Sequence, residues 1–114
     1  MPLKYPIGTI FFADKSSYED AIHPIVYFGP YDVDPSYYKA VMLTHSPYRG
    51  KNIAMSQEHF DKGYKYQTTY VVSTALIKPV DWIAYIHKGC LSDKGIKFIL
   101  DNIDMENPRL WSNV

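Results

Sequence analysis

The sequence predicts a small, mainly β domain with one helix near the C-terminus. Short runs rich in β-branched and aromatic residues alternate with Gly and Pro turn signals, which is the pattern of short strands. One late segment instead carries apolar residues at helical spacing. At 114 residues the chain can close one hydrophobic core but not two, so we expect a single domain over residues 1–114. A curled sheet or barrel is favoured because closure removes exposed strand edges.

Five or six short strands are expected along the chain, and no crossover helices alternate with them, which argues against a doubly wound fold. The expected strands cover residues 8–13, 22–28, 38–43, 52–55, 66–77 and 82–87. Residues 66–77 give the strongest strand signal of the chain. Residues 57–63 form either one helical turn closed by Gly63 or a loop.

A helix is expected from Ser92, which can cap its first turn, to about Ile103. Its apolar residues recur at i, i+3, i+4 and i+7, which gives one face to bury against the sheet. These residues are Ile96, Ile99, Leu100 and Ile103. The opposite face is not basic enough for a membrane-surface helix. The tail, residues 104–114, holds Leu110 and Trp111, which we expect to dock on the domain or on a second subunit.

Composition limits the partners and the compartment. Twelve basic and twelve acidic residues give a formal net charge of zero, so a site for RNA or another polyanion must be a local patch. Cys90 is the single cysteine, so no internal disulfide is expected. The four histidines lack metal-ligand spacing, so neither a metal nor another cofactor is expected. Apolar runs are too short to span a bilayer. With Pro2, Lys4 and Pro6 the N-terminus does not resemble a secretory leader, and a cytoplasmic location follows.

The third expected strand ends in a polar and cationic segment, THSPYRGK, residues 44–51. RNA cleavage without a metal needs a base, an acid and a positive group beside the phosphoryl oxygens. His45 can exchange protons at neutral pH, and Arg49 can contact a phosphate through two hydrogen bonds. The hydroxyls of Thr44 and Ser46 can hold the phosphate or the ribose. The alternative is an ordinary turn in which these hydroxyls satisfy backbone groups.

Other residues extend this candidate site. His23 can supply a second proton-transfer group if the second strand lies beside the third, although a histidine at this position can equally be packed in the core. Tyrosines can stack on unpaired bases and lysines can contact phosphates. The candidates for RNA contact are Tyr48, Lys51, Tyr64, Lys65, Tyr66 and Lys78.

Five short segments follow one another in a recognisable order between about residues 7 and 103. They are IGTIFF at 7–12, HPIV at 23–26, VMLTHS at 41–46, IKPVD at 77–81 and KGCLS at 88–92. In order and spacing, more than in identity, the chain resembles the PemK/Kid/MazF family of toxins from bacterial toxin–antitoxin modules. The resemblance implies an SH3-like, partly open barrel that forms a homodimer, cleaves single-stranded RNA such as mRNA without a metal, and is inhibited by an antitoxin protein.

The chain also departs from the family pattern. Thr44 and Ser46 occupy matching positions, but His23 stands where the family has an arginine. A segment that supplies an arginine and an acid in some members falls on residues 73–76, where Ser73 and Ala75 carry no charge. A non-catalytic barrel is therefore the alternative, either a gyrase poison like the fold-related CcdB toxins or a domain that binds RNA or protein. A third possibility is a protein-binding domain of a mobile element unrelated to toxicity.

Overall fold

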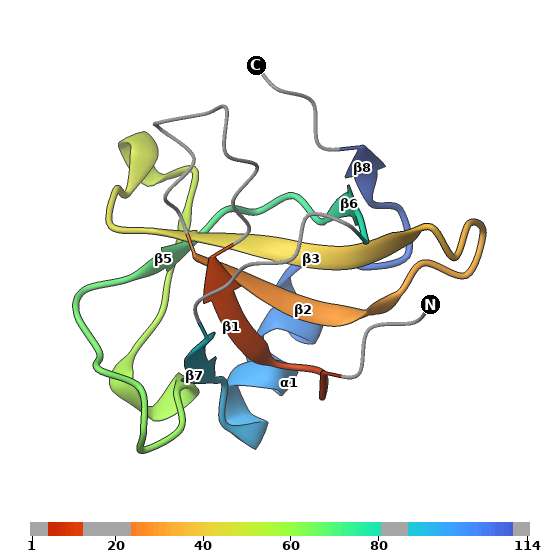
Figure 1. Ribbon diagram of the computed structural model, residues 1–114. Coiled ribbons are helices and arrows are strands. Elements are labelled where there is room, and N and C mark those ends of the chain that lie inside the picture. The colour runs from red at the N-terminus through yellow and green to blue at the C-terminus, as the bar shows by residue number, and fades with distance from the viewer. Residues whose placement is uncertain (1–4, 13–23, 81–86, 111–114) are drawn as a thin grey trace.

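Short strands form one open, curled sheet that packs against an α-helix near the C-terminus (Figure 1). This computed structural model describes residues 5–12, 24–80 and 87–110. The strands in this part of the chain are β1 Thr9–Phe12, β2 Pro24–Pro30, β3 Tyr37–Thr44, β4 Ile53–Ala54, β5 Tyr70–Val71, β6 Leu76–Pro79, β7 His87–Cys90 and β8 Arg109–Leu110. The expectation of a mainly β domain with a C-terminal helix is confirmed.

The sheet has β3 at its centre. Its strand order is β4-β5-β3-β2-β1-β7, and β6 also pairs with β3, while β8 pairs with β6. The β6–β8 pair is parallel and the other pairs are antiparallel. One edge of β3 pairs with β2, and the other pairs with β6 along residues 37–40 and with β5 at residues 43–44. Most of the other strands are therefore ordered by contact with β3 or its neighbours.

The two ends of the sheet meet at a seam. After β4 the chain forms a short 3₁₀ turn, η2 Gln57–His59, and then a bridge between Phe60 and Leu91 at the exit of β7. The amide of Asp61 donates to the Cys90 carbonyl at 2.9 Å, and the amide of Ser92 donates to the His59 carbonyl at 3.0 Å. We use "the seam" for this contact of residues 59–61 with residues 90–92. The seam nearly closes the open sheet into a barrel.

The single strand predicted over residues 66–77 is wrong, because two strands occur there. Tyr70 and Val71 pair with the end of β3, whereas β6 pairs with its beginning, and the register shifts between the two pairings. Between them the Val72 amide still donates to the Met42 carbonyl of β3 at 2.9 Å, and Ser73 and Thr74 form an exposed bend. The strand predicted over residues 82–87 falls outside the described residues, except at His87, where β7 begins.

The helix α1, Asp93–Asn102, matches the prediction closely. Ser92 caps it by accepting a hydrogen bond from the Gly95 amide at 3.2 Å. Ile99 and Ile103 are buried, but Leu100 is 55% exposed, so the buried face is narrower than the predicted four-residue stripe. No helix in the described part of the chain is both long and apolar enough to cross a membrane.

The buried side chains of the described residues form two clusters. The first consists of Ile10, Val26, Phe28, Val41, Leu43, Met55, Phe60, Val71, Ala75, Leu91, Ile99, Ile103 and Met105, and it fills the space between the sheet and α1. The second consists of Phe11, Ile25, Tyr27, Tyr38 and Ala40 from β1, β2 and β3. Strand residues alternate between the two faces of a sheet, so neighbours such as Ile10 and Phe11 enter different clusters. The central strands are therefore buried on both faces.

The C-terminal segment packs against the domain through residue 110. Met105 lies in the first cluster, and the Arg109 amide donates to the Ala75 carbonyl at 2.9 Å. Leu110 pairs with Ile77 in the β6–β8 ladder but leaves its side chain 57% exposed. Trp111, the other residue expected to dock on the domain or on a second subunit, lies outside the described residues.

Candidate nucleic-acid interface

The segment 44–51 forms a loop whose shape is set by its own side chains. The Thr44 hydroxyl accepts a hydrogen bond from the Ser46 amide, and the Ser46 hydroxyl accepts one from the Tyr48 amide, both at 3.2 Å. The side-chain amide of Asn52 donates to the Ser46 carbonyl at 2.9 Å. These bonds fit the turn alternative for the two hydroxyls, because each satisfies a backbone donor. We call residues 44–51 the cationic loop.

The tip of the cationic loop has a strained backbone. Tyr48 and Arg49, with φ of 45° and 55°, are the non-glycine residues with positive φ in the described chain, and they belong to the short turn η1 Tyr48–Gly50. Each such residue costs on the order of 1 kcal/mol or more. The amides of Gly50 and Lys51 close the turn by donating to the carbonyls of Pro47 and Tyr48, both at 3.0 Å. In Figure 1, η1 is the yellow-green turn that protrudes beyond the end of β3.

The strained turn exposes an aromatic ring and two cations. Tyr48 is 61% exposed, and the ammonium of Lys51 lies 5.6 Å from the centre of its ring. Arg49 is also exposed. Backbone strain of this kind is retained where it holds side chains in a useful position. The arrangement suits contact with phosphates and with the face of an unpaired base.

His45 fastens the cationic loop to the neighbouring chain. Its Nδ1 lies 2.7 Å from the Thr68 carbonyl oxygen, just before β5. Because a carbonyl only accepts hydrogen bonds, Nδ1 must carry the proton. In the neutral ring this leaves the lone pair on Nε2, and the side chain is exposed. The geometry thus gives His45 a fixed orientation and a basic nitrogen that can accept a proton.

The remaining candidate residues are not gathered at this loop. Tyr64 stacks on Phe60 with ring centres 4.5 Å apart, and the Tyr66 hydroxyl donates to the Met55 carbonyl at 2.9 Å. Both tyrosines are half-buried, whereas Lys65 is exposed. His23 lies outside the described residues. The expected surface is therefore divided between the cationic loop and the segment 61–69, which are linked by the contact between His45 and Thr68.

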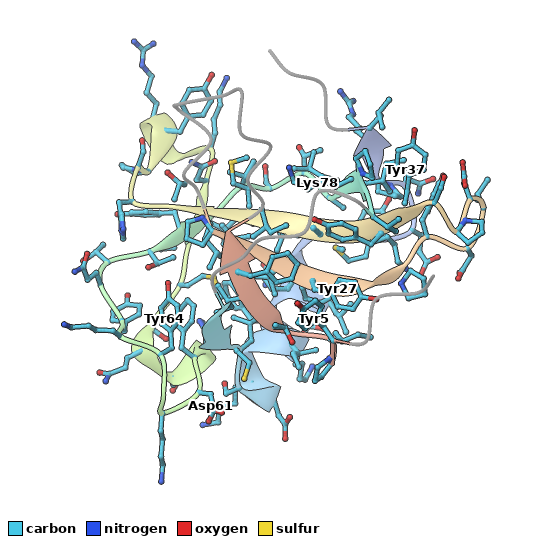
Figure 2. The ribbon with its side chains drawn as sticks, in the orientation of Figure 1. Tyr5, Tyr27, Tyr37, Asp61, Tyr64 and Lys78 are labelled. Carbon is cyan, nitrogen blue, oxygen red and sulfur yellow. The ribbon has the colours of Figure 1, made fainter. Side chains whose placement is uncertain are left out.

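Lys78 does not belong to any surface patch. It is 2% exposed and lies opposite Tyr38 in the β3–β6 ladder, beside the second cluster. Burial lowers its pKa to about 8. Figure 2 shows Lys78 far across the molecule from Tyr64 and Asp61. The expectation that Lys78 contacts RNA is corrected, because its ammonium is shielded from solvent.

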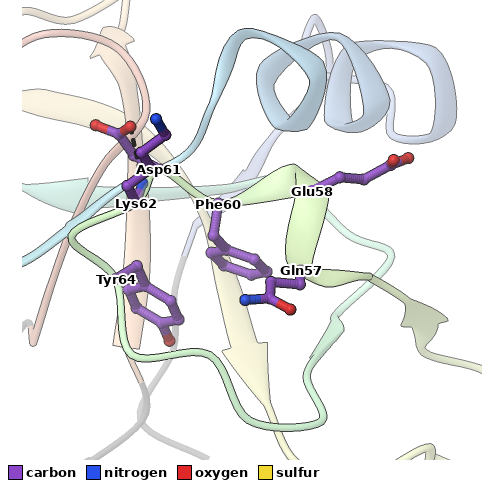
Figure 3. Close-up of a pocket in the computed structure, with 6 residues that line it drawn as sticks. All are labelled: Gln57, Glu58, Phe60, Asp61, Lys62 and Tyr64. Atoms are coloured by element: carbon purple, nitrogen blue, oxygen red, sulfur yellow. Dashed lines mark hydrogen bonds between the residues drawn. The ribbon is translucent and has the colours of Figure 1, made fainter.

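A hollow of about 450 Å³ lies next to the seam. Of the residues that line it, only Tyr64 is a candidate from the sequence. The lining residues are Gln57, Glu58, Phe60, Asp61, Lys62 and Tyr64 (Figure 3). Figure 3 shows the Phe60 and Tyr64 rings side by side, with Gln57 at one end and Asp61 and Lys62 at the other. The only sequence signal is the mixture of aromatic and charged residues in the expected turn 57–63.

Cys90 lies at the seam, with Sγ 3.8 Å from a carboxylate oxygen of Asp61. Burial, followed by the carboxylate of Asp61, raises the pKa of the thiol, which disfavours the reactive thiolate. Groups of three or more His, Cys, Asp or Glu side chains placed to hold a metal ion do not occur among the described residues.

Comparisons of the chain with protein-family models, curated proteins and solved structures give no match.

Proposed function

We propose that the cationic loop binds single-stranded RNA and that His45 promotes its cleavage, as in the toxins that the sequence resembles. The observation that carries the proposal is the bond from His45 to the Thr68 carbonyl, at 2.7 Å, in a loop that also exposes Tyr48 and Arg49. A base, a cation and a stacking surface are held together there. The base and the cation are two of the parts that attack by a ribose hydroxyl requires, and the third part is an acid.

In the proposed reaction, Nε2 of His45 takes the proton of the 2′-hydroxyl as the 2′-oxygen attacks the adjacent phosphorus. The bond from phosphorus to the 5′-oxygen of the next nucleotide breaks, and that oxygen gains a proton. The products are a 2′,3′-cyclic phosphate and a 5′-hydroxyl. Arg49 and Lys51 offset the charge that gathers on the phosphoryl oxygens. His23 is the candidate acid from the sequence, and the reaction as written needs no metal.

A second function, RNA binding without cleavage, is favoured by the hydroxyls of Thr44 and Ser46. Both already accept backbone hydrogen bonds, so they serve the turn. The uncharged residues Ser73 and Ala75 favour it as well, since they occupy positions where some of the resembled toxins carry an arginine and an acid.

Cleavage of mixed single-stranded RNA in EDTA separates the two functions. The wild type should cut the RNA, and His45→Asn should be at least about a hundredfold slower because it removes the proton acceptor. Asn keeps an amide donor near the position of Nδ1, so the bond to Thr68 can persist. Lys94→Ala, on the exposed face of α1, is the control and should cut normally. Equal rates for His45→Asn and wild type would contradict the catalytic role, whereas RNA bound but uncut would leave the binding function.

On the same resemblance, we propose that the protein acts in the cytoplasm as a homodimer and that an antitoxin protein silences it. Light scattering of the purified chain, alone and with the product of a neighbouring reading frame, tests both partners. A monomeric mass that is unchanged by that product would contradict them.

A further inference from the structure

The hollow at the seam has a mixed lining that restricts what can enter it. Phe60 is almost fully buried and its ring stacks on Tyr64 at an interplanar angle of 15°. Tyr64 is also fixed from behind, because a Cβ atom on Gly89 would lie only 3.3 Å from it. The aromatic pair forms an apolar wall of the hollow. A planar ring is the kind of group that packs well against such a wall.

The polar groups of the hollow indicate the chemistry of its occupant. The carboxylates of Glu58 and Asp61 only accept hydrogen bonds. Asp61 uses one oxygen for the Lys62 amide at 2.9 Å, and among the described residues its other oxygen has only the weak contact with Cys90 at 3.8 Å. Glu58 lies 4.0 Å from the ammonium of Lys94, so Asp61 offers the freer carboxylate oxygen of the two. A group that donates a hydrogen bond suits this oxygen, and the Lys62 side chain also lines the hollow. Gln57, at the other end of the aromatic pair, adds an amide that both donates and accepts.

The hollow is also close to the cationic loop along the chain. Tyr64 lines the hollow, and Thr68 accepts the bond from His45. Four residue steps separate them, which is at most about 14 Å at full extension. Lys65 lies between them and is exposed. One short strand of RNA can therefore reach from the loop to the hollow.

We infer that the hollow holds one unpaired base of the bound RNA and selects a base with an exocyclic amino group. Adenine, cytosine and guanine carry such a group, and a carboxylate accepts its hydrogen bond, whereas uracil carries none. Asp61 is the residue that makes the selection, and the wall of Phe60 and Tyr64 packs against the base. The inference rests on the proposed binding of RNA by the cationic loop, and it names the bases that this RNA must contain.

Binding of three homopolymeric oligonucleotides tests the inference. We would measure the affinity of 2′-O-methyl oligo(A), oligo(C) and oligo(U), which cannot be cleaved, by fluorescence anisotropy. The wild type should bind oligo(A) and oligo(C) about tenfold more tightly than oligo(U), as one carboxylate–amino contact predicts. Asp61→Asn should bring this ratio close to one, because an amide can also donate to uracil. Its Oδ1 can still accept from the Lys62 amide, and an unchanged thermal melt would show that the variant folds.

Two further variants make the outcome unambiguous. Asp101→Asn, an exposed carboxylate paired with Lys97 on α1, should keep the wild-type ratio. Arg49→Ala should weaken all three oligonucleotides equally, because it acts on phosphates. Equal wild-type affinities, or a ratio that survives Asp61→Asn, would overturn the inference and leave RNA binding intact. Failure of the wild type to bind any of the three would instead overturn the proposed function.

Discussion

Lys78 illustrates how one residue can depart from its usual place. Lysines are rarely fully buried, yet this one lies between β3 and β8 with only 2% of its surface exposed. Burial lowers its pKa to about 8, and burial likewise raises the pKa of Tyr38 across the strand pair and of Tyr27 beside it. Desolvation disfavours the charged form of each group. This site therefore affects stability rather than ligand binding.

Stability should rise with pH above about 8 because of Lys78. In this range the unfolded chain keeps the lysine proton, with an ordinary pKa near 10.4, while the folded chain loses it at about 8. The unfolded state then binds more protons, so the free energy of unfolding increases with pH, by roughly 2 kcal/mol between about pH 8 and pH 9.5. Burial raises the pKa of Tyr27 and Tyr38, so these groups oppose the increase, but only slightly below about pH 9.5, where most tyrosines are protonated in both states. Urea denaturation across this range measures the effect.

Lys78→Met should remove that increase and leave a slight decrease of stability with pH, because the raised pKa values of Cys90 and the buried tyrosines act in the opposite direction. Lys65→Met, which removes an exposed lysine, should keep the wild-type increase. A rise of equal size in Lys78→Met and in the wild type would show that Lys78 is not its source.

At the scale of elements, α1 packs closely against η2. A Cβ atom on Gly95 would lie 1.9 Å from the His59 carbonyl oxygen, so only glycine fits there. The ring of His59 stacks on Phe98 of α1 with centres 4.2 Å apart. The hydroxyl of Ser92 donates to the Glu58 carbonyl at 2.6 Å. The helix thus holds η2 in place, and η2 in turn positions the seam and the hollow.

Gly95→Ala should therefore destabilise the protein, by about 1–3 kcal/mol or more, because backbone must move to admit the methyl group. Gly63→Ala is the matched control, since a Cβ atom there meets nothing within 4 Å, and it should be neutral or slightly stabilising. Chemical denaturation measures both variants. Equal stability of the two would mean that α1 and η2 are not packed as described.

The whole molecule combines an arrangement that the sequence predicts with contacts that it does not. Turn residues and β-branched runs located most strands, and Ser92 with the apolar spacing located α1. The bend at Ser73 was missed because strand-forming residues flank it, and only pairing with two parts of β3 reveals it. The hollow could not be predicted because it lies where residues 57–64 meet β7, and these two segments are far apart in the sequence. Burial of Lys78 likewise depends on which strands become neighbours.

The cationic loop was predicted better than the rest of the candidate site, because its residues are adjacent in sequence. Its separation from Tyr64 and Tyr66 follows from the fold, which places those rings against the first buried cluster. The sequence could not show that the hydroxyls of Thr44 and Ser46 serve the turn, since this depends on local backbone geometry.

The central claim is that the cationic loop binds single-stranded RNA, and the salt dependence of binding tests it most directly. The affinity of an uncleavable oligonucleotide would be measured at several salt concentrations for the wild type and two double variants, Arg49→Ala with Lys51→Ala, and Lys94→Ala with Lys97→Ala on α1. Each phosphate contact contributes about 0.7 to the slope of log affinity against log salt for a single strand. Loss of the loop cations should therefore reduce the slope by about 1.4, while the variant on α1 keeps it. Equal slopes for the two double variants would contradict the claim.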